Sequence, residues 1–178
     1  FVPNLTFGPK FISNVRKISN KVFDVHLMIN RVEKFLDDYI RAGSDIITFH
    51  IEINEDIGNI IKKIKAKGIK CGLAIKPKTS WSEIQPYLQH IDQVIIMTVE
   101  PGFGGQEFMN DQVDKIKNIS NFIKLNNLRV GIEIDGGINF ETGQTCVEAG
   151  ANILVAGSFL FNQGDLIAAT NSLSDKFN

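Results

Sequence analysis

A glycine-rich stretch near the middle of the chain has the composition of a phosphate-binding loop. It comprises Gly102-Phe103-Gly104-Gly105, directly after a predicted strand and before a predicted helix. Glycines allow backbone N–H groups to approach a ligand closely, and the N-terminus of a following helix favours an anion. The same spacing also fits a tight turn that binds nothing.

A second glycine site, Ala156-Gly157-Ser158, lies at the end of the last predicted strand. Phosphate sites in α/β barrels commonly combine the loops after the last strands with a helix N-terminus. We therefore predict that Gly157 and Ser158 hold one phosphate together with the glycine-rich stretch.

Asp135 is the final residue of another predicted strand and precedes Gly136-Gly137. A carboxylate at the carboxyl end of a barrel strand faces the mouth, where it can bind a metal or move protons. An Asp before two glycines can instead cap a turn through its side chain. Glu133 lies on the same face but one layer deeper, and we expect it to support the site without reacting.

A histidine with possible chemistry lies in the strand Asp24-Val25-His26-Leu27-Met28. Side chains alternate along a strand, so Asp24, His26 and Met28 share a face, and Asp24 is placed to orient His26. A strand histidine can equally be structural, and His50, at the end of its own strand, has the same ambiguity.

The elements that must position these residues alternate between strand and helix. Glycines after the helices, such as Gly43, Gly68 and Gly150, match C-terminal caps. The unit repeats about every 24 residues, the size of a βα module. Apolar, β-branched runs predict strands at Val22–Leu27, Asp45–His50, Lys70–Ile75, Gln93–Val99, Val130–Asp135 and Asn152–Ala156, and helical spacing predicts helices at Gly8–Ile18, Arg31–Ala42, Glu55–Lys67, Asp111–Leu125 and Glu141–Ala149.

This alternation predicts a parallel sheet, either open and doubly wound or closed as a barrel. Four strands end in polar or glycine-rich residues, which favours a barrel because all strand ends then surround one mouth. We predict a single (β/α)8 TIM-barrel domain over residues 1–178 that is incomplete at its N-terminus. A complete barrel has eight βα units, so two strands and one helix, on the order of 40 residues, are expected before Phe1.

Composition limits the classes of partner. The chain has 19 Lys and Arg against 20 Asp and Glu, so no net basic charge attracts nucleic acid or an anionic membrane. We expect neither as a partner. The two cysteines, Cys71 and Cys146, lack the spacing of a metal or redox pair and are expected to be packing residues. No stretch has the roughly 20 apolar residues that span a bilayer.

Taken together, these segments resemble the ribulose-phosphate 3-epimerase family over nearly the whole chain. The matching stretches occur in the family's order, although related phosphosugar barrels share the glycine sites. They are Phe1-Val2-Pro3-Asn4-Leu5-Thr6-Phe7-Gly8-Pro9, Asp24-Val25-His26-Leu27-Met28, Ile46-Ile47-Thr48-Phe49-His50, Val99 to Gln106, Asp135-Gly136-Gly137 and Ala156-Gly157-Ser158.

The resemblance implies an isomerase that interconverts ribulose 5-phosphate and xylulose 5-phosphate in the pentose phosphate pathway, part of carbohydrate metabolism. It implies one divalent metal, zinc first, with iron, manganese or cobalt as alternatives. His26 would be a metal ligand, and Asp135 both a ligand and a proton-transfer residue. Met28 and Met97 resemble methionines that pack over the reacting carbons, although core packing explains them as easily. The phosphate ligands would be Gly102, Phe103, Gly104, Gly105, Gly136, Gly137, Gly157 and Ser158.

The resemblance places the family's other His and Asp ligands, and the second proton-transfer Asp, on a strand before Phe1. It also implies a homodimer or hexamer. The small number of cysteines favours a reducing compartment, the cytoplasm, with an organellar leader as the alternative. Two other functions stay open. One is a phosphosugar aldolase or decarboxylase that would use Lys76, which otherwise fits a loop at the barrel mouth. The other is a truncated product that binds phosphate without turnover.

Overall fold

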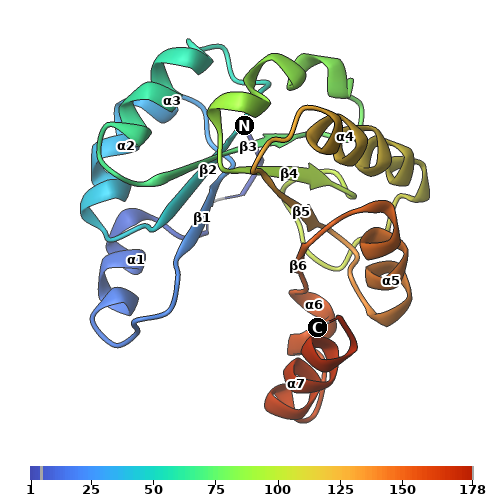
Figure 1. The fold of residues 1–178 in the computed structure, drawn as a ribbon. Helices are drawn as coiled ribbons and strands as arrows, with labels where there is room; N and C mark the ends of the chain where they lie inside the picture. Colours follow the sequence, from blue (N-terminus) through green and yellow to red (C-terminus); the bar gives the residue numbers. More distant parts are fainter. Residues whose placement is uncertain (5, 178) are drawn as a thin grey trace.

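The computed structural model describes residues 1–4 and 6–177, so Leu5 of the opening segment lies outside the described residues. Six parallel strands form one sheet in sequential order, with helices on its outer side (Figure 1). The strands are β1 (Asp24–Leu27), β2 (Ile46–His50), β3 (Lys70–Ile75), β4 (Gln93–Met97), β5 (Gly131–Asp135) and β6 (Ile153–Val155).

Each predicted helix is present, and the structure adds two helices near the C-terminus that the sequence pattern did not indicate. The helices are α1 (Pro9–Arg16), α2 (Val32–Arg41), α3 (Ile57–Lys65), α4 (Val113–Leu125), α5 (Phe140–Ala149), α6 (Ser158–Phe161) and α7 (Leu166–Phe177), with 3-10 helices η1 (Trp81–Glu83), η2 (Gln85–His90) and η3 (Asn110–Gln112). The connection from β3 to β4 therefore uses two short 3-10 helices in place of an α-helix.

The sheet is strongly curved, because it brings distant strands into contact. His26 on β1 and Asp135 on β5 are four strands apart in the sheet order, yet their side-chain atoms Nδ1 and Oδ2 lie 3.4 Å apart. Neighbouring strands lie about 4.8 Å apart, so a flat sheet would separate them by about 19 Å. This curvature confirms the predicted barrel-type fold. Within the described residues β1 and β6 are the two edges of the sheet.

Local signals explain why the elements end where they do. Asn139 caps α5 by accepting hydrogen bonds from the backbone N–H groups of Glu141 and Thr142. Gly150 after α5 has a φ of 112°, a conformation that costs little only for glycine. Gly43 and Gly68 also have positive φ values, so the predicted C-terminal caps are confirmed.

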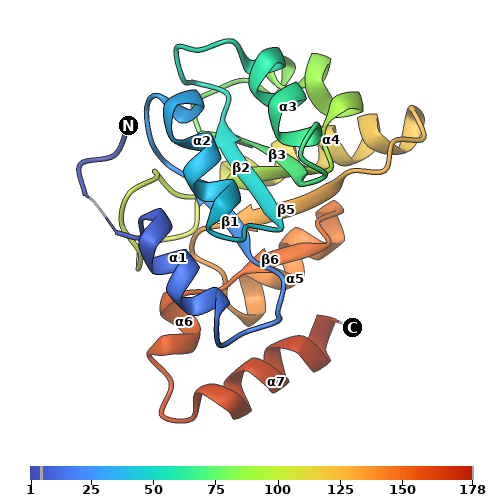
Figure 2. The ribbon, with the colours of Figure 1, turned by 90° about the vertical axis from the view of Figure 1, so that its left-hand side faces the viewer.

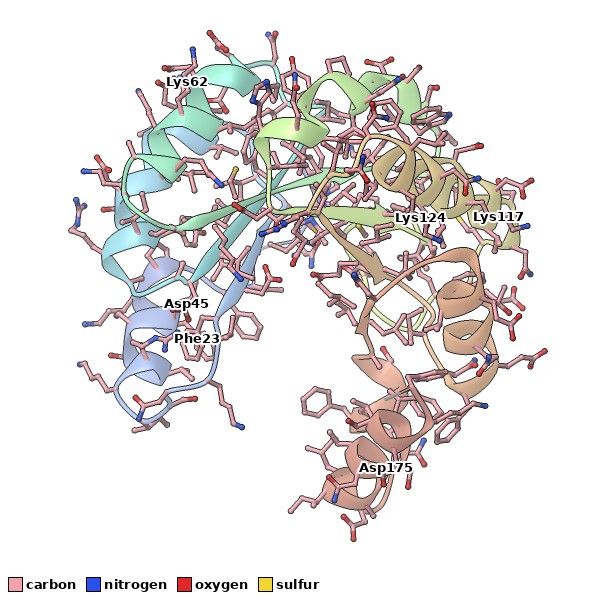
Figure 3. The ribbon with its side chains drawn as sticks, in the orientation of Figure 1. Phe23, Asp45, Lys62, Lys117, Lys124 and Asp175 are labelled. Carbon is pink, nitrogen blue, oxygen red and sulfur yellow. The ribbon has the colours of Figure 1, made fainter. Side chains whose placement is uncertain are left out.

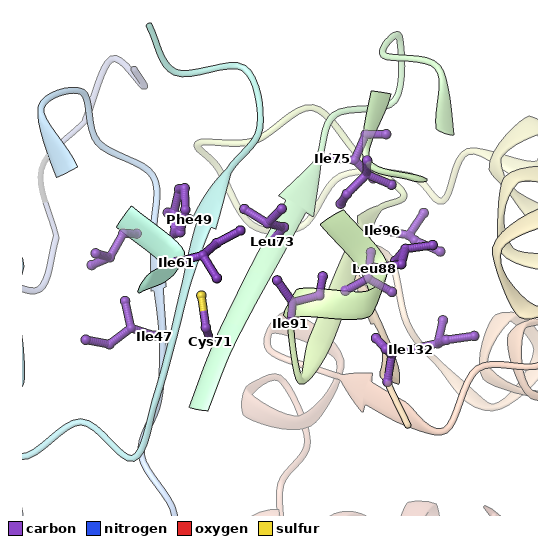
Figure 4. Packing of buried hydrophobic residues seen from close by; sticks show 14 of the residues in the cluster. Ile47, Phe49, Ile61, Cys71, Leu73, Ile75, Leu88, Ile91, Ile96 and Ile132 are labelled. Carbon is purple, nitrogen blue, oxygen red and sulfur yellow. The ribbon is translucent and has the colours of Figure 1, made fainter. Parts of the chain in front are cut away.

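The main core lies between the outer face of the sheet and the helices (Figure 4). Ile47 and Phe49 of β2 and Leu73 of β3 are fully buried there. Cys71 and Cys146 belong to the same core and form no disulfide, as predicted for packing residues. Because strand side chains alternate, the residues between these face the barrel interior, where the candidate site lies.

Asp45 ties the beginning of β2 to α1 and β1. Its Oδ2 atom lies 2.6 Å from Arg16 Nη2 and accepts a 2.7 Å hydrogen bond from the Phe23 backbone N–H. The Arg16 guanidinium also lies over the Phe23 ring. Figure 3 labels Phe23 and Asp45 at this end of the sheet. Figure 2 views this end of the sheet, with α1, α2 and β1 towards the reader. Among residues 1–4 and 6–177, no helix is long and apolar enough to cross a membrane.

Candidate active site

Several of the predicted site residues gather at the carboxyl ends of the strands, around a cavity of about 1020 Å³. The cavity is lined by His26 and Met28 from the β1 region, Met97 and Asp135 from the ends of β4 and β5, and the glycine-rich loop at 102–104. Residues from four separate parts of the chain therefore face one space. This is the arrangement that the strand-end pattern predicted.

His26 and Asp135 form the centre of this site. His26 Nδ1 lies 3.4 Å from Asp135 Oδ2, and both side chains are largely buried. A distance of 3.4 Å is longer than a usual hydrogen bond between nitrogen and oxygen. The two groups therefore face each other across a space somewhat wider than direct contact.

This spacing fits two ligands of one metal ion. Ligand atoms about 2.0 to 2.2 Å from a tetrahedral ion lie roughly 3.4 Å from each other. An imidazole nitrogen and a carboxylate oxygen are also donor types that zinc and related ions accept. In the part of the chain that the structure describes, no group of three or more His, Cys, Asp or Glu side chains is placed to hold a metal. The described residues thus offer one pair of side chains with this spacing.

His50 contacts His26 from the neighbouring strand β2. The two Nε2 atoms lie 2.9 Å apart, and His50 Nδ1 lies 3.1 Å from Glu52 Oε2. Burial lowers the pKa of His50 to about 4, with the hydrogen bond to Glu52 opposing this shift and the nearby His26 adding to it. His50 is therefore part of the site. Glu52 was missed in the sequence because it lies in a loop outside any motif.

Asp24 was expected to orient His26, but the structure gives it another partner. Its Oδ2 atom accepts a 2.7 Å hydrogen bond from Gln93 Nε2, which also donates to Glu133 Oε2 at 2.6 Å. Burial, together with the charges of Asp24 and Asp135, raises the pKa of Glu133 to about 9. Glu133 is therefore protonated near neutral pH. It lies beneath the site, as the strand pattern indicated.

The two predicted phosphate segments lie side by side. A Cβ atom added at Gly104 would be 3.0 Å from Ser158 Oγ, and one added at Gly105 would be 3.8 Å from it. Gln106 shapes this loop, because its Nε2 donates to the backbone carbonyls of Glu100 and Phe103. Gly157 has open space around its Cα, with no atom near the position of a Cβ. This surface, made by backbone and a hydroxyl, suits a phosphate.

Close packing explains why positions 136 and 137 are occupied by glycine. A Cβ at Gly136 would lie 2.5 Å from Val99 Cγ2, and one at Gly137 would lie 2.7 Å from the Phe108 backbone nitrogen. Thr98 Oγ1 also donates to the Gly136 carbonyl at 2.6 Å, which holds the turn after Asp135. Their predicted contact with phosphate stays a prediction.

Met28 and Met97 pack together with Ala74, Ile95 and Val99 in a small apolar cluster on the inner face of the sheet. Met97 pairs in register with Asp135, so its sulfur-bearing side chain and the carboxylate lie on neighbouring strands. Polarisable, non-basic side chains thus border the His26 and Asp135 pair.

Lys76, the residue that a lysine-dependent enzyme would use, follows β3. Its Nζ lies 3.8 Å from the centre of the Phe1 ring, and its backbone N–H donates to Glu52 Oε1 at 2.7 Å. The ammonium group therefore rests on an aromatic face, a favourable position for a cation.

Comparison with known proteins gives a consistent picture. A family model described as "Ribulose-phosphate 3 epimerase family" matches residues 1–161. Ribulose-phosphate 3-epimerase of Bacillus subtilis is 39% identical over 93% of this chain and 76% of its own length. The Rhodobacter capsulatus ribulose-phosphate 3-epimerase is 42% identical over 93% of this chain and 72% of its own length.

Solved structures of other enzymes share the fold. The 3-keto-L-gulonate-6-phosphate decarboxylase of Vibrio cholerae has a TM-score of 0.69 at 17% identity, covering 96% of this chain and 80% of that one. The 3-hexulose-6-phosphate synthase of Salmonella typhimurium has a TM-score of 0.64 at 18% identity, with the same coverage. At these identities the similarity concerns the fold alone.

Proposed function

Since the chain belongs to the ribulose-phosphate 3-epimerase family, an isomerase family, we propose that it interconverts ribulose 5-phosphate and xylulose 5-phosphate through an enediolate. The observation that carries the proposal is the His26 and Asp135 pair, 3.4 Å apart in a cavity that the glycine-rich loop also lines. Such a site has a proton-transfer group at one end and a phosphate cradle at the other. Both are needed for a phosphorylated ketose.

The phosphate end fixes the orientation of the substrate. Backbone N–H groups of the loop at 102–105, with Gly157 and Ser158, are proposed to bind the dianion, because Ser158 lies against Gly104. Binding the phosphate away from the reacting carbon holds the sugar in one pose. Proton transfer at C3 then has the advantage of a fixed geometry.

At the other end, Asp135 is proposed to transfer the C3 proton. The ketone at C2 makes that proton removable, and its loss gives an enediolate with negative charge on oxygen. Returning a proton to the opposite face of C3 gives the other epimer. Inversion therefore needs a second acid–base group facing Asp135 across the carbon. Met28 and Met97 border the carbons without offering a proton.

We propose that His26 and Asp135 hold one divalent metal, with zinc as the first choice and iron, manganese or cobalt as alternatives. When bound, such an ion supplies positive charge that stabilises the developing negative charge on the substrate oxygens. The support is the donor pair and its spacing. Asp135 keeps its own role, which is to move the proton at C3.

The test is to follow ribulose 5-phosphate by NMR with the complete protein before and after treatment with a chelator. The proposal predicts conversion to xylulose 5-phosphate, loss of activity on chelation and recovery when zinc is returned. If a phosphosugar is converted even in the presence of the chelator, and if Lys76→Ala abolishes that conversion, the result would instead favour a lysine-dependent decarboxylase or aldolase. Phosphate binding with no conversion in the presence of metal would favour a binding role.

The cellular compartment and the oligomeric state are also part of the proposal. We propose a cytoplasmic homo-oligomer, a dimer or a hexamer, that takes a small phosphosugar and neither nucleic acid nor membrane as its partner. The charge balance of 19 basic and 20 acidic residues supports this choice of partner. Sedimentation of the purified protein measures the assembly directly.

A further inference from the structure

We propose that His50 and Glu52 are positioning residues, which fix the ring proton of His26 on Nε2 and so leave Nδ1 free to bind a metal ion. The inference deepens the proposed function, because it rests on His26 being a ligand there. Neither residue needs to touch the substrate. They act through the hydrogen bonds that connect them to His26.

The three side chains form a continuous chain of short contacts. Glu52 Oε2 lies 3.1 Å from His50 Nδ1, and His50 Nε2 lies 2.9 Å from His26 Nε2. The two imidazole rings are tilted by only 21° from each other. The ring centroids lie 4.9 Å apart while the two Nε2 atoms are only 2.9 Å apart, so the rings meet edge to edge through these nitrogens. The other nitrogen of His26, Nδ1, faces Asp135.

The direction of each hydrogen bond follows from this geometry. A histidine binds a metal through a nitrogen that carries no proton, so a ligand Nδ1 requires the His26 proton on Nε2. That N–H can donate only if His50 Nε2 accepts, which places the His50 proton on Nδ1. The Glu52 carboxylate then accepts from it. Every donor in the chain meets an acceptor, and the free lone pair lies next to Asp135.

Glu52 is held so that it can only accept from His50. Its second oxygen, Oε1, receives the backbone N–H of Lys76 at 2.7 Å, and Thr79 also donates to the carboxylate. His50 is fully buried and its ring lies 4.5 Å from that of Phe1, so water does not replace Glu52 as its partner. A carboxylate that satisfies two N–H donors cannot be matched by an amide, which has one oxygen.

Glu52→Gln should therefore reverse the chain. If the amide oxygen keeps the Lys76 N–H, the NH2 group faces His50 Nδ1, which must then accept. The His50 proton moves to Nε2, and the His26 proton moves to Nδ1, towards the metal position. Loss of such an orienting partner typically weakens metal binding by about 10- to 100-fold.

Glu55→Gln is the matched control in the same loop. The Glu55 carboxylate also accepts two backbone N–H groups, from Val32 and Glu33, but it lies outside the chain that leads to His26. A general loss of loop stability would affect both variants. A positioning role predicts that only Glu52→Gln alters His26.

The first measurement is long-range ¹H–¹⁵N NMR of the metal-free protein at about pH 8, above the usual histidine pKa of about 6.5. The chain has three histidines, so His90→Gln, at an exposed position, and His26→Gln each remove one set of signals and thereby assign all three. Wild type is expected to show the proton on Nε2 of His26, and Glu52→Gln to show it on Nδ1. Zinc affinity, measured by competition with a chelating dye, should fall by about 10- to 100-fold in Glu52→Gln and stay within about 2-fold in Glu55→Gln.

A wild-type His26 that carries its proton on Nδ1 would overturn the proposal without any variant. So would equal losses of zinc affinity in the two variants. The tautomer is read without substrate, which separates this inference from the activity. A protein with the expected tautomer that fails to epimerise ribulose 5-phosphate would refute the proposed function and leave the positioning chain standing.

Discussion

Glu133→Gln should remove a strong pH dependence from the stability of the protein. Glu133 is only 5% exposed, and burial, with the charges of Asp24 and Asp135, raises its pKa from 4.5 to about 9. In the unfolded chain the carboxyl loses its proton above about pH 4.5, whereas the folded protein keeps it up to about pH 9. The stability from this group is therefore greatest below pH 4.5 and is lost as the pH rises towards 9.

The size of the effect follows from the shift. One pH unit is worth about 1.36 kcal/mol, so between pH 5 and pH 8 the wild-type free energy of unfolding should fall by up to about 4 kcal/mol relative to Glu133→Gln. Glutamine has no titrating proton, and it preserves the hydrogen bonds. Its oxygen can accept from Gln93, and its NH2 group can donate to Asp24, with which Glu133 also shares a hydrogen bond.

This difference can be measured by urea unfolding of the metal-free protein at several pH values. The fluorescence of Trp81, the chain's single Trp, reports the unfolding. Glu148→Gln, at an exposed position on α5, is the control and should follow wild type. If wild type and Glu133→Gln lose stability in parallel between pH 5 and pH 8, the assignment of a protonated Glu133 is wrong.

Three further changes test the packing and the phosphate cradle. Gly104→Ala places a Cβ 3.0 Å from Ser158 Oγ. It should raise KM for ribulose 5-phosphate by about 10-fold in steady-state assays while the melting temperature stays unchanged. An unchanged KM would show that this loop does not bind the phosphate. Asp45→Ala loses the Arg16 ion pair and the Phe23 N–H bond, and because Asp45 is half exposed, chemical denaturation should show a loss of only about 1 kcal/mol. Cys71 is fully buried, and burial raises its pKa to about 12. Its thiol should therefore be alkylated at pH 8 only as fast as the protein unfolds, and it should stay unmodified in the native protein.

The sequence predicted the parallel α/β architecture because strand and helix periods differ clearly and glycine caps mark the helix ends. The strand ends were placed within two residues of their observed positions, for example Gln93–Met97 against the predicted Gln93–Val99. The helix α7 (Leu166–Phe177) was missed, since its apolar residues are mostly exposed and give no clear stripe. Residues 81–90 form 3-10 turns around Pro86, which does not suit an α-helix interior.

The sequence predicted the site residues that lie at strand ends. It did not predict the contacts that depend on the curvature of the sheet. His26 and Asp135 meet in one cavity, as the strand pattern indicated, and Met97, which the family resemblance indicated, lines the same cavity. Asp24 pairs with Gln93, a residue from three strands away in the sheet, and no local pattern shows such a contact. Glu52 was missed for a similar reason, because it reaches His50 from a loop after the strand ends.

The most direct test of the central claim is C3 proton exchange of ribulose 5-phosphate in D2O with the complete protein and its Asp135→Asn variant. Asparagine keeps the shape of the side chain but cannot accept the proton, so exchange should fall by at least about 100-fold while the fold is retained. Exchange at the wild-type rate in a folded Asp135→Asn protein would remove Asp135 from the reaction and contradict the account.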